Sequence, residues 1–473
     1  MRRSVGWLLS GLLALSAGTA LGEEANSDSP RPIPLTRPEV KQLLEEMKDR
    51  TPRIPLPELT DADREALGER ADSYEARLRY HYAPQNPNRN DGRGAGGGEG
   101  LGGGRNREPD PNSTLDYPFK TMLFWIVSRT NNCQYCLGHQ EIKLAVAGLT
   151  EEQIAALDGN WSIYTPAEQA AFAYARKFTY EPHLLSDADI DALRPYYTDL
   201  QILEMSMSMA GNNSINRWKE GTGVPQSRTL HNFSSRSETP PPADRILPTE
   251  TFLTPTPEEY LDLVTSVAPL DTDATSGAPA GLAVSHRPPL ESPEEVEAAL
   301  SACRQRTPRL PLVSEDETRK LLEGAAEGPI PQWMRLLANF PRDGVRSIRN
   351  TQDALAQEGD LTPLMKAQAA WIIARQDRAW YATGLAKQWL GELGQTDEQT
   401  YQLDGDWSEF TPAERSLFTL ARNLACSPVV LTDVQVNEAL AQTSPRHVVQ
   451  MITFTTGRAS FNRITECAGL QLE

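Results

Sequence analysis

Apolar residues recur every three or four positions along most of the chain, which is the period of an amphipathic helix. The apolar stripe over residues 172–178 returns over residues 418–424. Thr165 precedes the first stripe, with a proline next to it and Glu168 three positions on, a combination typical of a capped helix start. No long run alternates between apolar and polar residues, as a half-buried strand would. The pattern therefore predicts an all-α chain.

The sequence also repeats itself, with residue 157 aligning with residue 403, an offset of 246. Between residues 157–177 and 403–423, twelve of the 21 positions are identical. The shorter stretch 50–56 returns as residues 306–312. Because the repeated features are helix caps and apolar stripes, we expect two α-helical domains in tandem.

Composition divides the rest of the chain. Residues 84–114 are rich in Gly, Asn and Pro, and residues 224–292 in Pro, Ser and Thr, so neither stretch is expected to form a packed core. The predicted segments are a helical prefix at 23–83, a flexible insertion at 84–114, the first domain at 115–223, a linker at 224–292 and the second domain at 293–473. A short helix is expected inside the linker, at residues 257–267. Ordinary helices are expected over residues 331–361.

Residues 1–22 predict a signal peptide. Arg2 and Arg3 precede an apolar core over residues 7–15, and small residues follow. The core is too short for a transmembrane helix and no later segment is long enough, so we expect a secreted or periplasmic protein without a membrane span. The net charge is −18, and removal of two arginines leaves 44 basic against 64 acidic residues, or −20. This acidity argues against a nucleic-acid partner.

Redox chemistry is indicated at one place in the chain. Cys133 and Cys136 are three residues apart, and His139 follows after three more, which puts all three on one face of a helix. Asn131 and Asn132 stand where a helix cap belongs, so both cysteines are expected in the first turn. The positive end of a helix favours a thiolate there. An acidic thiol, a second thiol and an imidazole predict a peroxidase or a dithiol oxidoreductase.

Other chemistries of paired cysteines fit less well. Covalent haem attachment needs a histidine directly after the second cysteine, where Leu137 stands. A structural zinc site needs four ligands, and no second pair occurs at the required spacing. A structural disulfide remains an alternative, although closing so small a loop contributes little stability. The other cysteines, which have no neighbouring Cys or His, are Cys303, Cys426 and Cys467.

The second copy lacks the residues of this motif. The three positions are occupied there by Ala379, Ala382 and Leu385. The second copy is therefore expected to keep the fold without thiol chemistry.

Two polar positions near the end of each repeat are kept in both copies, as Asn216 and Arg217 in the first and Asn462 and Arg463 in the second. Because they persist where the cysteines are lost, we expect them to satisfy buried helix ends or to join the two copies. His183 has no counterpart in the second copy and is expected to be exposed to solvent.

Three stretches of the first copy, residues 129–139, 148–153 and 211–217, resemble the carboxymuconolactone decarboxylase / alkylhydroperoxidase D-like family. The resemblance covers about residues 115–220 and centres on the Cys-x-x-Cys motif. It implies two alkylhydroperoxidase D-like helical domains in tandem, the second of them degenerate. By the same resemblance, the two copies pair as a pseudo-dimer within the chain, and the chain assembles into a homo-oligomer.

In redox members of this family the second cysteine attacks a peroxide and the first resolves the product. The resemblance thus makes Cys136 the nucleophile and Cys133 the resolving thiol, with His139 helping to move protons. The implied partners are a peroxide or disulfide substrate and a dithiol electron donor, with no metal or organic cofactor. Two positions depart from the family pattern, since Gln140 stands in place of its usual histidine and Thr121 in place of a relay glutamate.

The interpretation that follows is an exported, thiol-dependent oxidoreductase that reduces peroxides. The same family contains a decarboxylase that acts on a lactone acid without a cysteine pair, and such a lyase is one alternative. A non-catalytic scaffold is another, in which the cysteines form a structural disulfide and the second copy docks a partner. The Cys-x-x-Cys motif and the predicted export favour the oxidoreductase over the lyase.

Overall fold

The computed structural model describes residues 28–82, 110–226, 251–263, 290–323, 328–356 and 359–473. Across these ranges the chain is helical and forms no strand, which confirms the predicted all-α class. The predicted signal peptide lies outside the described residues, as do most of the predicted insertion and linker. Among the described helices, none is long and apolar enough to cross a membrane.

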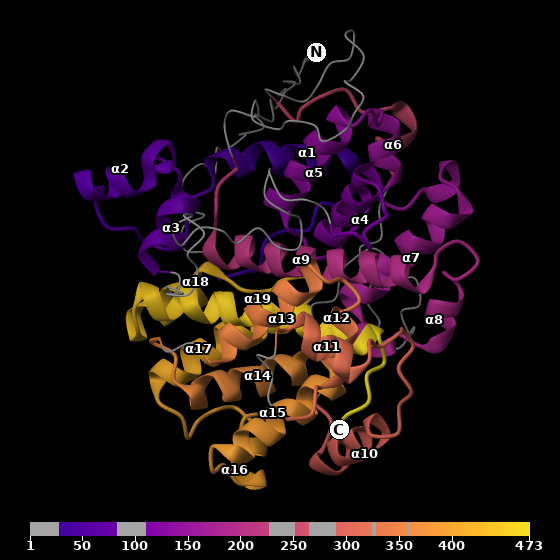
Figure 1. Ribbon diagram of the computed structural model, residues 1–473. Helices are drawn as coiled ribbons and strands as arrows, with labels where there is room; N and C mark the ends of the chain where they lie inside the picture. Colours follow the sequence, from indigo (N-terminus) through magenta and orange to yellow (C-terminus); the bar gives the residue numbers. More distant parts are fainter. Residues whose placement is uncertain (1–27, 83–109, 227–250, 264–289, 324–327, 357–358) are drawn as a thin grey trace, which may run out of the picture.

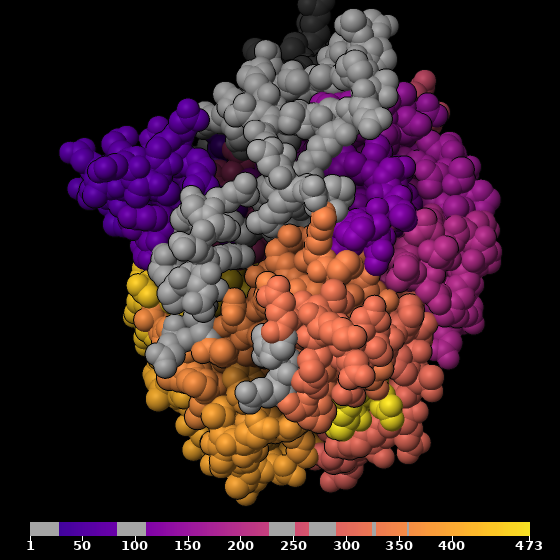
Figure 2. All heavy atoms as spheres, in the orientation of Figure 1, coloured from indigo at the N-terminus to yellow at the C-terminus, as the bar shows by residue number. Residues whose placement is uncertain are grey.

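The first half of the chain consists of a helical prefix followed by the first repeat. The prefix helices are α1 (Arg37–Glu46), α2 (Asp61–Leu67) and α3 (Tyr74–Tyr82), with 3₁₀ turns at Met47–Asp49 and Gly68–Arg70. The repeat contains α4 (Tyr117–Thr130), α5 (Gln134–Val146), α6 (Glu151–Ala156), α7 (Pro166–Tyr180), α8 (Asp187–Asp191) and α9 (Asp199–Thr222). Figure 2 shows α2 and α3 (indigo) as a projection at one edge of the molecule, whereas α1 lies beside α5 (Figure 1).

The second half follows the same order. It begins with α10 (Pro293–Cys303), α11 (Glu315–Leu321), α12 (Gln332–Leu337) and α13 (Asp343–Ala356). It continues with α14 (Pro363–Asp377), α15 (Trp380–Glu392), α16 (Asp397–Gln402), α17 (Pro412–Ala425), α18 (Asp433–Gln442) and α19 (Pro445–Cys467). Each of α14 to α19 starts 246 residues after its counterpart in α4 to α9. The sequence repeat is therefore also a repeat of helices, and the helices expected over residues 331–361 are present as α12 and α13.

The capping signals read from the sequence form as expected. Thr165 and Thr411 each accept a hydrogen bond from the backbone N–H three residues on, and the side chains of Glu168 and Glu414 bond back to the threonine N–H groups. These capping boxes start α7 and α17 at equivalent positions.

The two longest helices, α9 and α19, lie side by side at the centre of the molecule (Figure 1). They run antiparallel, because Gly221 near the end of α9 packs against Ile452 near the start of α19. Helices α4, α5 and α7 pack on α9, and α14, α15 and α17 pack on α19. One continuous apolar core runs through both halves.

Two buried arginines join the halves across this central contact. Arg217 of α9 donates a hydrogen bond of 3.0 Å to the carbonyl of Ala425, the last residue of α17. Arg463 of α19 donates one of 3.1 Å to the carbonyl of Thr179, near the end of α7. Thr179 and Ala425 are equivalent positions of the repeat, so the contacts are reciprocal. Each guanidinium sits at the negative end of a helix, where a cation is favourable.

The neighbouring asparagines form hydrogen bonds with the side chains of residues at helix ends. Asn216 accepts a hydrogen bond of 3.0 Å from Asn131, the residue that ends α4. Asn462 donates one of 2.9 Å to Asp377, which ends α14. Together with the arginine contacts, these bonds confirm that the polar positions kept in both copies bind residues at helix ends and join the two copies.

His183 is not in the exposed position expected from the sequence. It is half-buried, with Nε2 lying 3.2 Å from Nη1 of Arg378 in the second half. The prediction was wrong because the connection after α7 packs against the other copy.

The predicted flexible insertion ends earlier than expected. Asp110 is buried, and its carboxylate accepts hydrogen bonds from the backbone N–H groups of Arg342 and Asp343 at 2.8 and 2.9 Å. Asn112 donates one of 2.6 Å to the carbonyl of Asn339. Residues 110–114 therefore form an ordered contact with the second half, which corrects the predicted boundary.

Part of the predicted linker is also packed. Phe252 and Tyr260 are each 2% exposed, and Lys41 of α1 donates a hydrogen bond of 2.8 Å to the carbonyl of Thr254. The helix expected at residues 257–267 is one 3₁₀ turn, Glu258–Tyr260, with residues 264–267 outside the described part. The described part of this segment is anchored by its aromatic residues.

A chain that ends at Pro240 tests whether the second half is a packing partner of the first. Without the second half, the α9 surface around Arg217 would be exposed, and the guanidinium would lose its acceptors at Ala425, Cys426 and Ser427. We expect the shortened chain to self-associate or aggregate, since large uncovered apolar faces drive association. Size-exclusion chromatography with light scattering measures this. A well-folded monomer would show that the first half does not need this contact.

Candidate functional site

The two cysteines lie at the junction between α4 and α5. Asn131 ends α4, Asn132 takes a left-handed backbone conformation with φ of 56°, and Cys133 is the N-cap residue of α5. Cys136 lies in the first turn of α5, as expected. The expectation that an asparagine caps α5 was wrong, because Asn132 supplies the left-handed turn that reverses the chain. The next residue, Cys133, is the N-cap instead.

The sulfur atoms of Cys133 and Cys136 lie 2.6 Å apart and are not bonded to each other. A disulfide bond is about 2.05 Å long, so a small shift would let one form. The Sγ of Cys133 also accepts a hydrogen bond of 3.4 Å from the backbone N–H of Cys136. The side chains are only 0% and 2% exposed. The pair is therefore a buried dithiol whose sulfur atoms are close enough to form a disulfide after a small shift.

Burial keeps Cys133 protonated. Burial, and next the Cys136 thiol, raises the pKa of Cys133 well above its ordinary value, and the charge of Glu220 adds to this rise. The N–H of Cys136 acts in the opposite direction without outweighing these effects. Burial alone would raise the pKa of Glu220, but Arg50 and two further arginines outweigh it and lower that pKa. Glu220 is therefore charged, and the helix start does not make the Cys133 thiol acidic.

His139 contacts Tyr135. Its Nδ1 lies 3.1 Å from the backbone carbonyl oxygen of Tyr135, and the two rings stack with centroids 4.4 Å apart. Burial, followed by the charges of Lys143 and Lys219, lowers the pKa of His139 to about 3. The imidazole is therefore neutral and weakly basic near neutral pH. So weak a base is poorly suited to the expected removal of a thiol proton. That role of His139 stays a prediction.

The two positions that depart from the family pattern bond to nearby carbonyl groups. Thr121 donates a hydrogen bond of 2.8 Å to the carbonyl of Tyr117, one turn earlier in α4. Gln140 donates one of 3.2 Å to the carbonyl of Cys136. Neither side chain can act as an acid or a base in the usual pH range.

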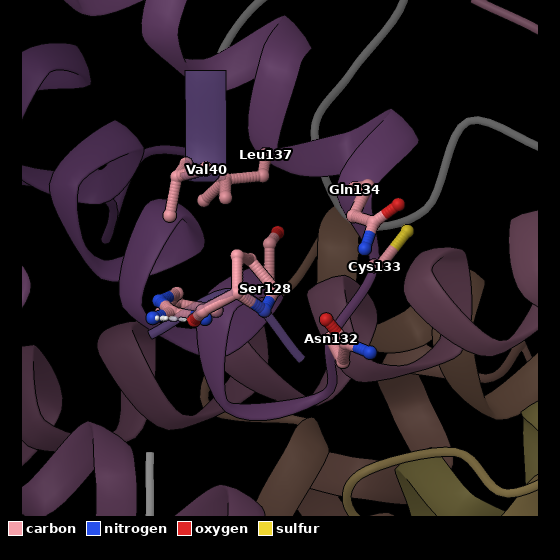
Figure 3. A pocket seen from close by; sticks show the side chains of 8 residues that line it. Val40, Ser128, Asn132, Cys133, Gln134 and Leu137 are labelled. Carbon is pink, nitrogen blue, oxygen red and sulfur yellow. Dashed lines mark hydrogen bonds between the residues drawn. The ribbon is translucent and has the colours of Figure 1, made fainter. Parts of the chain in front are cut away.

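A narrow hollow opens next to Cys133 (Figure 3). Its walls include Pro34 and Val40 from the prefix, Ser128 of α4, and Leu137 of α5. Cys136 and His139 are not among the residues that line it. The hollow is too narrow for a water molecule, so a molecule from solvent cannot reach Cys133 through it unless its walls move.

One wall belongs to the prefix segment of residues 31–34, which we call the strap. Arg129 donates a hydrogen bond of 2.6 Å to the carbonyl of Pro34. Asn132 and Gln134 each donate one of 3.2 Å to the carbonyl of Pro32. The strap thus lies across the junction that carries Cys133 and is held by side chains from both sides of it.

The second copy reproduces the backbone of this junction without its chemistry. Ala379 has φ of −87° and ψ of 88°, against −87° and 89° for Cys133. Arg378 takes the left-handed conformation of Asn132, with φ of 51°. The junction therefore forms without cysteines, and the thiols are not required for the local fold.

Sequence reasoning missed the charged residues around the dithiol. Glu220 is kept as Glu466 in the second copy, so the repeat could have indicated a structural role for it. Lys219 is replaced by Thr465, a difference that a position-by-position comparison of the copies would have shown. Glu75 lies in α3, where the repeat gives no counterpart to compare.

A scan of the chain against models of known protein families finds no match, and a search of curated proteins finds none either.

Replacing His139 with Leu, the residue at the equivalent position 385, should make stability less sensitive to acid. The pKa of about 3 lies below the ordinary 6.5, so between these pH values the unfolded chain binds a proton at this residue and the folded protein does not. The resulting stabilisation is complete above pH 6.5 and is lost as the pH falls toward 3. Between pH 7.5 and 5 the wild type should lose about 2 kcal/mol through this group. Urea unfolding at both pH values measures the loss, and equal losses in the two proteins would contradict it.

Proposed function

We propose that the chain is a thiol-dependent oxidoreductase that reduces peroxides through Cys133 and Cys136. The observation that carries the proposal is the pair of unbonded sulfur atoms 2.6 Å apart at the start of a helix. The absence of both cysteines from an otherwise equivalent junction in the second copy supports a role in chemistry rather than in folding.

The reaction consumes one peroxide and oxidises the dithiol. The thiolate of Cys136 attacks one peroxide oxygen, the O–O bond breaks, and the other oxygen leaves as an alcohol or water after taking a proton. Cys136 is then a sulfenic acid. The thiol of Cys133 attacks the Cys136 sulfur, water leaves, and a disulfide forms. An external dithiol restores both thiols and is itself oxidised to a disulfide.

The burial of Cys133 suits the resolving role. A thiol with a raised pKa is a poor first nucleophile, since the thiolate is the reactive form. Cys136, in the first turn, is the better candidate for attack. It does not line the hollow, however, so the proposed reaction requires an opening motion, and the strap is the wall that we propose moves.

The organisation of the chain belongs to the same proposal. The helix-by-helix correspondence supports two alkylhydroperoxidase D-like domains, and the reciprocal arginine contacts support an intrachain pseudo-dimer. We also propose that the chain is exported, on the basis of residues 1–22.

Single cysteine replacements separate the two roles. Peroxide added to the reduced wild type should yield a Cys133–Cys136 disulfide, found by alkylation and mass mapping. Cys136→Ser should abolish turnover, while Cys133→Ser should allow one oxidation and stop at a sulfenic acid or mixed disulfide. Cys426→Ser, in the second half, is the control. Full turnover of the Cys133→Ser protein would contradict the resolving role, and no disulfide in the wild type would contradict the proposed redox reaction of the pair.

Loosening the strap should expose the thiols. In Asn132→Gly combined with Gln134→Ala, the glycine keeps the left-handed backbone while both side-chain bonds to Pro32 are lost. Losing these two hydrogen bonds, of about 1 kcal/mol each, should speed alkylation of the native reduced protein about thirtyfold. Gln388→Ala, on an exposed face of α15, is the control. An unchanged rate would show that another segment limits access.

A further inference from the structure

A buried ion pair lies beside the residue that precedes Cys136. Lys219 of α9 is 6% exposed and pairs with Glu75 of α3. Arg79 of the same helix holds Glu75 at 2.9 Å. The ammonium of Lys219 lies 4.3 Å from the centroid of the Tyr135 ring, a distance at which a cation is attracted to an aromatic face.

Tyr135 connects this charge to the dithiol. Its ring stacks on His139, and it is followed directly by Cys136 in the first turn of α5. Burial raises the pKa of Tyr135, Lys219 opposes the rise, and Glu75 and Cys136 add to it. The tyrosine is therefore within electrostatic reach of both the ammonium and the Cys136 sulfur, and Lys219 acts on it more strongly than Glu75 does.

The ion pair is charged at neutral pH. Burial alone would lower the pKa of Lys219, but Glu75 and Tyr135 outweigh it and raise that pKa. Burial alone would raise the pKa of Glu75, but Lys219 and Arg79 lower it to about 2. Lys219 is therefore a fixed, buried positive charge.

The second copy has lost this charge together with the thiols. Thr465 replaces Lys219, and its hydroxyl donates a hydrogen bond of 2.9 Å to the carbonyl of Phe461 in its own helix. Tyr381 replaces Tyr135 and is fully buried, but its hydroxyl has no hydrogen-bond partner. The tyrosine and its helix are thus kept where the cation is not, which separates the ammonium from the requirements of folding.

We propose that Lys219, held by Glu75 against Tyr135, is a positioning residue whose positive charge, next to the residue that precedes Cys136, favours the thiolate of Cys136. This inference rests on the proposed function. The thiol proton passes to solvent, and Lys219 keeps its own proton throughout. The charge stabilises the thiolate without moving a proton, at a site where Thr121 and Gln140 provide no proton relay.

Other ionisable groups also face the pair. Glu220 of α9 opposes thiolate formation, and arginines from the prefix neutralise it. The ionisable groups that act on Cys133, Tyr135 or His139, directly or through Lys219 and Glu220, are Glu75, Arg79, Lys143, Lys219, Glu220, Arg31, Arg50 and Arg53. Substitution at Lys219 changes one of these while leaving the Glu220 cluster in place.

The test is the pH profile of Cys136 alkylation by iodoacetamide in the reduced full-length protein, resolved by mass mapping. Lys219→Met should move the midpoint up by about one unit, so that alkylation below the midpoint slows about tenfold. Lys219→Arg keeps a charge and should leave the midpoint near that of the wild type. Lys177→Met removes a comparable lysine from its ion pair with Asp189 and is the matched control, with no expected shift.

A second variant avoids leaving the carboxylate of Glu75 buried without its lysine partner. Glu75→Gln combined with Lys219→Met removes both charges, a change that buried ion pairs often tolerate. Its midpoint should also rise, since the ammonium is the stronger influence on Tyr135. A folded double variant with the wild-type midpoint would overturn the inference.

The outcomes separate this inference from the proposed function. Wild-type turnover with an unshifted midpoint in both Lys219→Met variants would overturn the role of Lys219 and leave the proposed function standing. A raised midpoint in a protein that reduces no peroxide would support the charge effect and overturn the proposed function.

Discussion

The reciprocal contact between α9 and α19 positions the helices of each half that pack on them. Arg217 and Arg463 are buried almost completely, and each binds the carbonyl end of a helix from the opposite half. A buried guanidinium without such acceptors would be costly, so the halves are stable only when both contacts form together. This fixes α9, and α9 in turn carries Lys219 and Glu220 to the junction where α4 meets α5.

At that junction, burial and charge act against each other. Burial raises the pKa of Cys133 and lowers that of His139, which would leave a dithiol with neither an acidic thiol nor a base. The helix start and the proposed charge of Lys219 act in the opposite direction at Cys136. The strap adds a second constraint, because it lies across the junction that carries Cys133, and both cysteines are covered although the proposed reaction needs an oxidant to reach them. A site of this kind is protected at rest and depends on local opening.

The helices were predictable from local signals, whereas the surroundings of the dithiol were not. The threonine caps and the first-turn position of Cys136 depend on residues near one another in sequence, and the repeat follows from comparing the two copies; all three are present. The cap of α5 was assigned one residue early, because sequence preference cannot distinguish an asparagine that caps from one that turns left-handed. The strap and Glu75 lie far from Cys133 in sequence, and only tertiary packing brings them to it.

The central claim is that Cys133 and Cys136 form a redox-active pair rather than a structural bridge. The most direct measurement is the reduction potential of the pair, obtained by equilibrating the full-length protein with dithiol buffers and quantifying the Cys133–Cys136 disulfide by mass mapping. Catalytic dithiols lie at about −120 to −270 mV, and structural disulfides lie below about −300 mV. The account predicts a potential in the first range. A potential below about −300 mV, or a pair that forms no disulfide at any buffer potential, would contradict it.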